Sequence, residues 1–299
     1  MSGRASSGSS EAGASEGGTT IWHRLLGLDH RILATFVAVI ITYVMLNPFK
    51  IPFPVTSYGQ TYYDFVTGIE PGSMVGFMCS DTPSTKPSLQ PASVLMMEIL
   101  FEKDCKILFW QDEAFGVPIY EEYMALAQSE IDKQLEYGVD YINLGYIAGT
   151  ESGTAAFLAD IRKTTGGIDA YGNDIEQYPI MQGVNTGSDF DYGFANVACR
   201  CTEPLYVRQW ADPYGVPLAT INCAMDLTAV QPYLATGQMA ATANGLLGSA
   251  EMEYLTGNLG LAFGQTLSVS MAGLYFVILI ILGNVFFFLS RGAGPQEAS

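Results

Sequence analysis

The sequence predicts a single three-layer α/β domain of the Rossmann-like type, with a mostly parallel sheet, flanked by two transmembrane helices. Two long apolar runs near the ends of the chain predict the membrane helices. Alternating short apolar runs and longer helical patterns between them predict the domain. The 30 acidic residues outnumber the 13 basic ones, which gives a net charge of −17. This balance excludes a nucleic-acid binder, because polyanion binding needs clustered Lys and Arg.

The first membrane helix is expected at 32–49, where Ile32 to Leu46 carries no charge. A buried core helix or the apolar part of a signal peptide is the alternative for this marginal run. The second helix is expected at 267–290, because Leu267 to Leu289 is a run of 23 uncharged residues. These two helices would make the lipid bilayer a partner of the chain.

Positive charges near the helix ends predict the orientation, because such residues stay on the cytoplasmic side. Arg24 and Arg31 precede the first helix and Arg291 follows the second, against Lys50 alone on the opposite side. We therefore expect cytoplasmic tails and an extracytoplasmic domain in a two-pass protein.

The ends of the chain lack the residues of a packed core. Residues 1–20 are rich in Gly and Ser, which predicts a disordered tail. A juxtamembrane segment is expected at 21–31, and a short C-terminal tail at 291–299.

The middle of the chain, 50–266, is predicted to be one acidic α/β domain. Between 51 and 266 the chain has 26 acidic and 8 basic residues. Strands are expected at 73–79, 106–110, 140–146, 192–198, 216–223 and 238–243. Helices are expected at 89–104, 117–137, 152–163, 203–212, 227–234 and 249–255. No second domain and no internal repeat is expected.

Several reaction classes are excluded by what the sequence lacks. No histidine follows His30, so the domain cannot form a Ser-His-Asp or Cys-His pair or a His-ligated zinc site. The chain also has no P-loop, no GxGxxG fingerprint and no GxSxG elbow. No cofactor is expected.

Ligands of open α/β sheets bind outside the carboxyl ends of the strands. The candidate catalytic residues at these ends are Asp81, Ser84, Asp112 and Glu113. The candidate ligand-binding residues are Gly149, Thr150, Ser152, Asn244 and Gly245. Two simpler interpretations stand beside these. Ser152 is also an ordinary helix N-cap, and adjacent carboxylates are frequent by chance in so acidic a domain.

Four of the five cysteines fall at predicted strand ends: Cys79, Cys199, Cys201 and Cys223. One or two disulfides are the expectation if the domain faces an oxidising compartment. A metal site is an alternative, although the Cys-x-Cys spacing is not that of a zinc knuckle. The third interpretation is small buried apolar side chains.

Several phrases of the sequence resemble an uncharacterised family of archaeal and bacterial membrane-anchored α/β proteins. They are PSTKP at 83–87 with Pro91, YGVDYINLGY at 137–146, YGVP at 214–217, GQ at 237–238 and GLLGSAE at 245–251. The resemblance covers roughly 30–290 and implies the order helix, α/β domain, helix. It implies no activity and no catalytic residue.

Three functions follow as hypotheses. The first is a binding or scaffolding module, an accessory subunit of a membrane-associated assembly that contacts a protein partner or a second copy of itself. The small and polar residues of 267–290 suit helix packing in a membrane. The second is a membrane-tethered hydrolase or transferase acting on a lipid-linked or cell-surface substrate. The third is a solute sensor, for which no output domain is recognisable.

Overall fold

A computed structural model of the chain describes residues 29–198 and 203–292. The predicted tail at 1–20, most of the juxtamembrane segment, positions 293–299, and both Cys199 and Cys201 lie outside the described residues. The chain divides into two units. The domain unit is Tyr43–Ser268, and the helical unit contains the described residues before and after it.

The domain is built on a six-stranded parallel sheet with the order β3-β2-β1-β4-β5-β6. The strands are β1 (Met74–Ser80), β2 (Lys106–Gln111), β3 (Tyr141–Tyr146), β4 (Tyr192–Val197), β5 (Leu218–Asn222) and β6 (Ala241–Asn244). All six predicted strands are confirmed to within three residues, with β6 starting three residues late. The parallel α/β sheet is consistent with a Rossmann-like fold.

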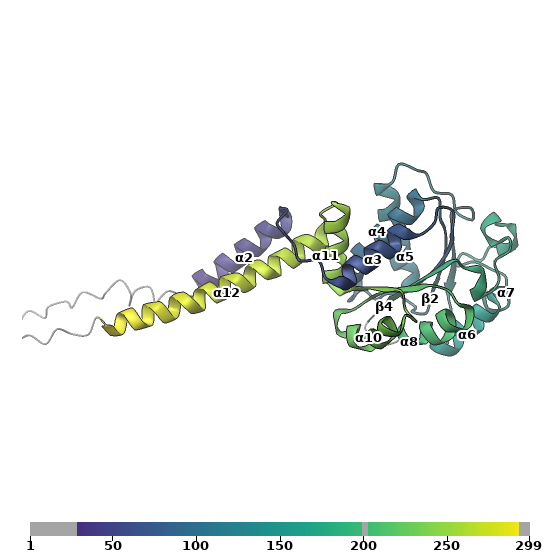
Figure 1. Cartoon of the computed structure of the whole chain (residues 1–299). Helices are drawn as coiled ribbons and strands as arrows, with labels where there is room; N and C mark the ends of the chain where they lie inside the picture. Colours follow the sequence, from purple (N-terminus) through teal and green to yellow (C-terminus); the bar gives the residue numbers. More distant parts are fainter. Residues whose placement is uncertain (1–28, 199–202, 293–299) are drawn as a thin grey trace, which may run out of the picture. The chain divides into compact units, whose positions relative to one another are not determined.

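Helices cover both faces of the sheet (Figure 1). One layer contains α3 (Ser57–Gly68), α4 (Lys86–Glu102), α5 (Gly116–Glu130) and α11 (Gly245–Thr256). The other contains α6 (Thr150–Ala159), α7 (Ile161–Thr165), α8 (Glu203–Tyr206), the π-helical η4 (Val207–Ala211) and α10 (Leu227–Thr236). Short helical turns complete it: α9 (Asp212–Tyr214), η1 (Ile175–Gln177), η2 (Pro179–Met181), η3 (Gly187–Asp189) and η5 (Ala224–Asp226).

Successive strand residues feed two separate cores, as the pleat of a strand requires. Val75 and Phe77 of β1 belong to the core beneath α3, α4, α5 and α11. Met78 of β1 and Trp110 of β2 belong to the core on the opposite face. Because both faces are covered, the strands have the nearly continuous apolar sequences from which they were predicted.

Two paired glycines make room for Trp210 on the second face. Gly76 of β1 and Gly193 of β4 stand opposite each other in the sheet. A Cβ atom at Gly76 would lie 2.6 Å from Cη2 of Trp210, and one at Gly193 would lie 2.9 Å from it. The indole Nε1 of Trp210 donates to the Gly187 carbonyl at 3.1 Å. The large ring therefore packs directly against the backbone of the two central strands.

Two helices differ from the expectation. The sequence did not predict α3, which begins after Thr56, whose hydroxyl accepts from the Gly59 N–H at 3.2 Å. Helix α5 was predicted to reach residue 137 but ends at Glu130. The Gln128 amide replaces the helical hydrogen bonds there, donating to the Lys133 carbonyl at 2.8 Å and accepting from the Leu135 N–H at 2.9 Å.

Helix α11 holds two connecting segments of the domain unit through buried carboxylates. Glu253 accepts from the backbone N–H groups of Gly260, Ala262 and Phe263 at 2.9, 3.1 and 2.6 Å. These donors open the helix that starts at Leu261. Glu251 accepts from the N–H of Thr56 at 2.6 Å and from its hydroxyl at 3.1 Å. Both segments are therefore bonded to one helix.

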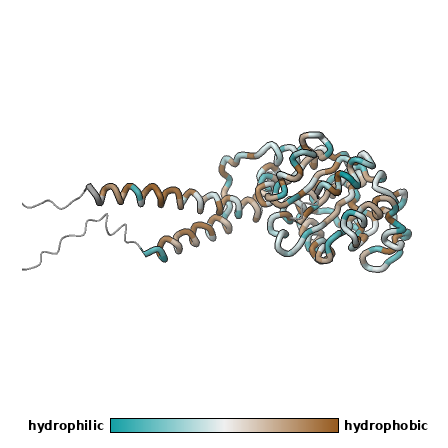
Figure 2. Tube along the Cα trace, turned by 90° about the horizontal axis from the view of Figure 1, so that it is seen from below, coloured by the Kyte–Doolittle hydropathy of each residue, from teal (hydrophilic) through white to brown (hydrophobic). Residues whose placement is uncertain are grey.

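The helical unit contains most of α2 (His30–Leu46) and most of α12 (Leu261–Gly292), and apolar residues run along both (Figure 2). Among the described residues, one helix is long and apolar enough to cross a membrane: the stretch Leu261–Leu289 of α12, with a mean hydropathy of 2.5. The expectation of two such helices was wrong. Helix α2 has 17 residues, about 26 Å of helix against a hydrocarbon core of about 30 Å. Pro48 prevents the expected extension to Phe49, because the residue before a proline disfavours helix.

Helix α2 contacts α12 along one face within this unit. Its partly buried side chains recur at Leu33, Val37 and Ile40, at helical spacing. The Tyr275 hydroxyl of α12 donates to the Leu33 carbonyl at 3.2 Å. The other faces of both helices expose large apolar side chains, such as Phe36 at 60% and Phe288 at 68%.

Candidate functional site

The sheet order reverses between β1 and β4, and ligands of open α/β sheets bind outside the carboxyl ends of the strands at such a point. Asp81 directly follows β1 and is fully buried. Its carboxylate accepts from the hydroxyls of Tyr123 and Thr85, and from the Thr82 N–H at 2.7 Å. Burial raises the pKa of the Asp81 carboxyl, which these hydrogen bonds partly oppose. These three donors are thus already bonded to Asp81 and are not free to bind a ligand.

Asp112, which follows β2, accepts from the Tyr206 hydroxyl at 2.8 Å. Burial, followed by the charges of Asp81 and Asp112, raises the pKa of the Cys79 thiol well above its ordinary value. The structure therefore brings Cys79, Asp81 and Asp112 together at the end of the two central strands. A thiol with a raised pKa is protonated at neutral pH and is a poor nucleophile or metal ligand. No group of three metal-ligating side chains occurs within 29–198 and 203–292.

The other two predicted catalytic residues, Ser84 and Glu113, differ in exposure. Ser84 is exposed, and its hydroxyl is 2.9 Å from that of Thr82. Glu113 is 8% exposed. Asp81 and Asp112 thus have tyrosine partners, while the exposed hydroxyl of Ser84 bonds within its own loop.

The predicted ligand-binding residues do not form one site. Gly149, Thr150 and Ser152 follow β3, whereas Asn244 and Gly245 follow β6. These are the two edge strands of the sheet. The Ser152 hydroxyl donates to the Gly149 carbonyl at 2.9 Å, so it closes the first turn of α6. These residues were predicted to lie together because the order of the strands in the sheet cannot be inferred from the sequence pattern.

The cysteines differ in state. Cys79 and Cys105 are free and buried. Cys223, which follows β5, is disulfide-bonded. Cys199 and Cys201 lie outside the described residues. A disulfide is therefore present among the predicted cysteines, and Cys79 takes no part in it.

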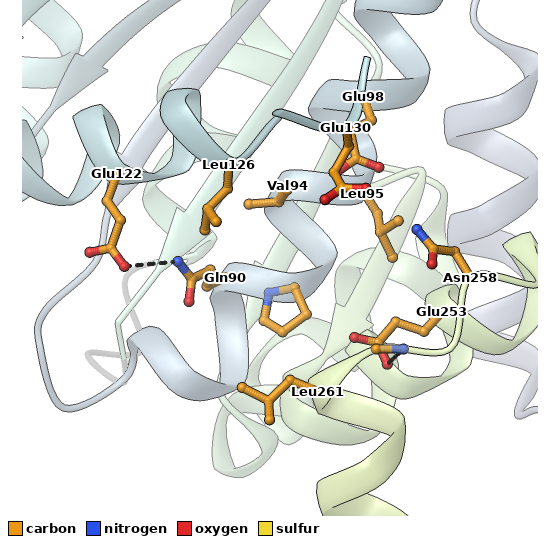
Figure 3. A pocket seen from close by; sticks show the side chains of 12 residues that line it. Gln90, Val94, Leu95, Glu98, Glu122, Leu126, Glu130, Glu253, Asn258 and Leu261 are labelled. Carbon is orange, nitrogen blue, oxygen red and sulfur yellow. Dashed lines mark hydrogen bonds between the residues drawn. The ribbon is translucent and has the colours of Figure 1, made fainter. Parts of the chain in front are cut away.

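A groove of about 450 Å³ lies between α4, α5 and the connection from α11 to α12 (Figure 3). Its lining consists of apolar side chains and four glutamates, with no basic residue. The lining residues are Gln90, Pro91, Val94, Leu95, Glu98, Glu122, Leu126, Glu130, Glu253, Asn258, Gly260 and Leu261. Leu126 and Leu261 are 40% and 53% exposed, so part of the apolar surface is open to solvent.

The charge of two groove glutamates is uncompensated. Glu122 forms an ion pair with Lys86, and Glu253 is bonded to backbone N–H groups. Glu98 and Glu130 form no ion pair with any basic side chain in the part of the chain that the structure describes. Burial, followed by the charges of Glu130 and Glu102, raises the pKa of Glu98 to about 7.

Stability is expected to fall as the pH rises through neutrality. Glu98 has a pKa of about 7 in the fold against an ordinary 4.5, so the folded state binds the proton more tightly. This contribution is fully present below the unfolded pKa and is lost as the pH rises through the folded one. The expected loss is about 1–2 kcal/mol between about pH 5 and 8, after allowing for solvent in the groove.

Thermal unfolding of the full chain in detergent across this pH range measures the effect. Other buried carboxyls contribute in the same direction, so the comparison with Glu98→Gln isolates Glu98. Glu70→Gln, at an exposed position, should keep the wild-type slope. An unchanged slope in Glu98→Gln would contradict the assignment.

This groove was not predicted from the sequence, although each of the two helices that line it has a visible stripe of lining residues. Pro91, Leu95 and Glu98 recur at helical spacing on α4, as Glu122, Leu126 and Glu130 do on α5. Their pairing depends on helix packing and on the turn after α11, which the stripes alone do not specify.

Comparisons with known proteins add little. No family model matches the chain, and no curated protein matches it. Among solved structures, a chain described as "crystal structure of AibC" matches with a TM-score of 0.31 and 10% identity. The match covers 73% of this chain and 51% of that one, so this chain spans about half of its length.

Proposed function

We propose that the chain is a membrane-anchored binding module, an accessory subunit of a membrane-associated assembly. The groove between α4, α5 and the start of α12 would hold a basic, amphipathic segment of a partner protein. The observation that carries the proposal is the apolar floor of this groove beneath Glu98 and Glu130, which have no described ion pair.

A basic amphipathic segment meets both properties of the groove. Its apolar residues would cover Leu126 and Leu261, which are partly open to solvent. Its Lys or Arg side chains would lie against Glu98 and Glu130, which repel each other when the groove is empty. Complementary charge supports partner choice and association rate more than raw affinity. The excess of acid over the whole chain, −17, favours a basic partner further.

Helix α12 is the proposed membrane anchor, with the α/β domain extracytoplasmic and the end of the chain cytoplasmic. Arg291 follows the apolar run of α12, and the positive-inside rule favours the cytoplasm for it. The disulfide at Cys223 supports an oxidising compartment for the domain. Protease added to intact cells should then digest the domain and spare a tag after Ser299. The proposed resemblance to membrane-anchored α/β proteins agrees with this arrangement.

A membrane-tethered hydrolase or transferase is the second candidate. In its favour, Asp81 and Asp112 both lie near the Cys79 thiol at the switch of strand order. Against it, both carboxylates accept hydrogen bonds from buried tyrosines, and the thiol is held protonated. The groove therefore supports binding better than this cluster supports catalysis.

The experiment compares two double variants of equal charge in the native membrane. Glu98→Gln with Glu130→Gln removes the two groove charges, whereas Glu70→Gln with Glu136→Gln removes two exposed charges elsewhere. After extraction in mild detergent, we expect a stoichiometric complex with the wild type and the control. The groove variant should lose its companion, and added salt should weaken the wild-type complex.

Three results would contradict the proposal. One is a companion that the groove variant retains at full stoichiometry. Another is a complex whose mass is a multiple of the 32.3 kDa chain, which would identify a second copy as the partner. The third is a monomer that carries a small metabolite, which would favour the enzyme instead.

A further inference from the structure

We propose that a tyrosine-lined cleft on the other side of α5 binds a small organic ammonium ion. The cleft has a volume of about 350 Å³ and lies away from the groove described above. Its lining residues are Tyr120, Glu121, Met124, Ala125, Gln128, Gln134, Leu135, Tyr137, Tyr141 and Tyr171. Four aromatic rings and one carboxylate are thus present in the lining, and no basic side chain is.

The rings stand at steep angles around Tyr137. Its ring centroid is 5.4 Å from that of Tyr141, at an interplanar angle of 87°, and 5.6 Å from that of Tyr171, at 65°. Because the rings are steeply inclined to one another, their faces point in different directions. A cation within about 6 Å of such a face is attracted by the ring quadrupole.

Buried and acidic groups hold these rings in place. Tyr137 and Tyr178 donate to the Asp169 carboxylate at 3.0 and 3.1 Å, and Asp169 is 4% exposed. Tyr171 donates to Glu121 at 3.2 Å. Burial raises the pKa of Asp169, but hydrogen bonds from Asn173, Tyr171 and Tyr137 outweigh burial and leave this pKa below its ordinary value. The cluster is therefore ordered before any ligand binds, which reduces the entropic cost of binding.

A second observation points to a ligand. The Tyr120 side chain lines the cleft and is 2% exposed, yet its hydroxyl has no hydrogen-bond partner in the described parts of the chain. After burial, the nearby hydroxyls of Tyr141, Tyr171 and Tyr137 raise its pKa. A buried hydroxyl without a partner is costly, and a ligand group could satisfy it. An ammonium ion with a polar substituent fits the rings, Glu121 and this hydroxyl together.

Choline is the probe, because its neutral isostere 3,3-dimethylbutan-1-ol has the same shape without the charge. The full chain is placed in phosphatidylglycerol nanodiscs and titrated calorimetrically with each compound. We expect choline to bind about threefold to thirtyfold more tightly than the isostere, which is the range that cation–π attraction supplies. The same titration in phosphatidylcholine nanodiscs distinguishes two natural ligands. If the natural ligand is a lipid headgroup, phosphatidylcholine would already occupy the site and suppress choline binding. If it is a free small molecule, choline binding would be unchanged. Either result supports the ammonium site.

Two variants of Tyr171 distinguish the contribution of its ring from that of its hydroxyl. Tyr171→Leu should weaken choline binding about threefold to thirtyfold, while Tyr171→Phe keeps the ring and should stay near wild type. Tyr146→Leu is the matched control, because both tyrosines are 50% exposed and Tyr146 lies outside this cleft. Equal binding of the isostere, equal losses in Tyr171→Phe and Tyr171→Leu, or no choline binding in phosphatidylglycerol nanodiscs would each overturn the proposal. None of these outcomes bears on the groove, so this inference and the proposed function fail separately.

Discussion

Replacing Glu253 with alanine is expected to lower the free energy of unfolding by about 2–4 kcal/mol, taking about 1–2 kcal/mol for each of the two buried donors, Ala262 and Phe263, that are left without an acceptor. The carboxylate is 4% exposed and accepts from three backbone N–H groups at the start of α12. The first N–H groups of a helix have no partner within the helix, and water cannot replace this carboxylate in a buried place. Thermal or denaturant unfolding of the full chain in detergent, followed by circular dichroism, measures the loss.

Two further variants make this expectation specific. Glu253→Gln keeps one acceptor oxygen and the volume of the side chain, so its loss should be clearly smaller than that of Glu253→Ala. Glu70→Ala removes an exposed glutamate and should change the stability by less than about 0.5 kcal/mol. A loss below about 1 kcal/mol in Glu253→Ala would show that the start of α12 does not depend on this cap.

Replacing Trp110 with alanine is expected to cost about 3–5 kcal/mol, the usual range for a fully buried tryptophan. Trp110 has no exposed surface. Its ring lies 4.8 Å from Phe157, 5.2 Å from Trp210 and 6.1 Å from Phe190, measured between centroids. The substitution removes one member of a four-ring cluster and leaves a cavity that β2 cannot close. Chemical denaturation followed by circular dichroism measures this cost independently of tryptophan fluorescence.

Trp110→Phe is the informative companion to that variant. It keeps an aromatic ring in the cluster, and it removes an indole N–H that has no hydrogen-bond partner within the described residues. Losing this donor offsets part of the lost contact, so the cost should be well below that of Trp110→Ala. Equal costs for the two variants would contradict this expectation, because they would mean that a phenyl ring at this position recovers none of the contacts of the indole.

The sheet was predictable because strands buried on both faces are nearly continuous apolar runs, as at β2. Helix α3 was missed because its sequence, SYGQTYYDFVTG, has few aliphatic residues, and its burial depends on packing against β6 and α11. Helix α2 was expected to be longer because hydropathy alone does not register the stop that Pro48 imposes.

The candidate site was predictable only in part. Asp81 and Asp112 were found because they follow central strands, where the fold places functional groups. Gly149 and Asn244 were grouped with them although β3 and β6 are opposite edges of the sheet, and strand order is not encoded in the runs themselves. The groove and the tyrosine cleft each combine segments far apart in sequence, so only packing could reveal them.

Helix α11 gives the domain a single point of mechanical loading. The segment at Thr56 and the first turn of α12 are bonded to Glu251 and Glu253, two residues apart on this helix. A force on either segment would therefore act on α11 through these carboxylates, so one helix couples the two segments mechanically.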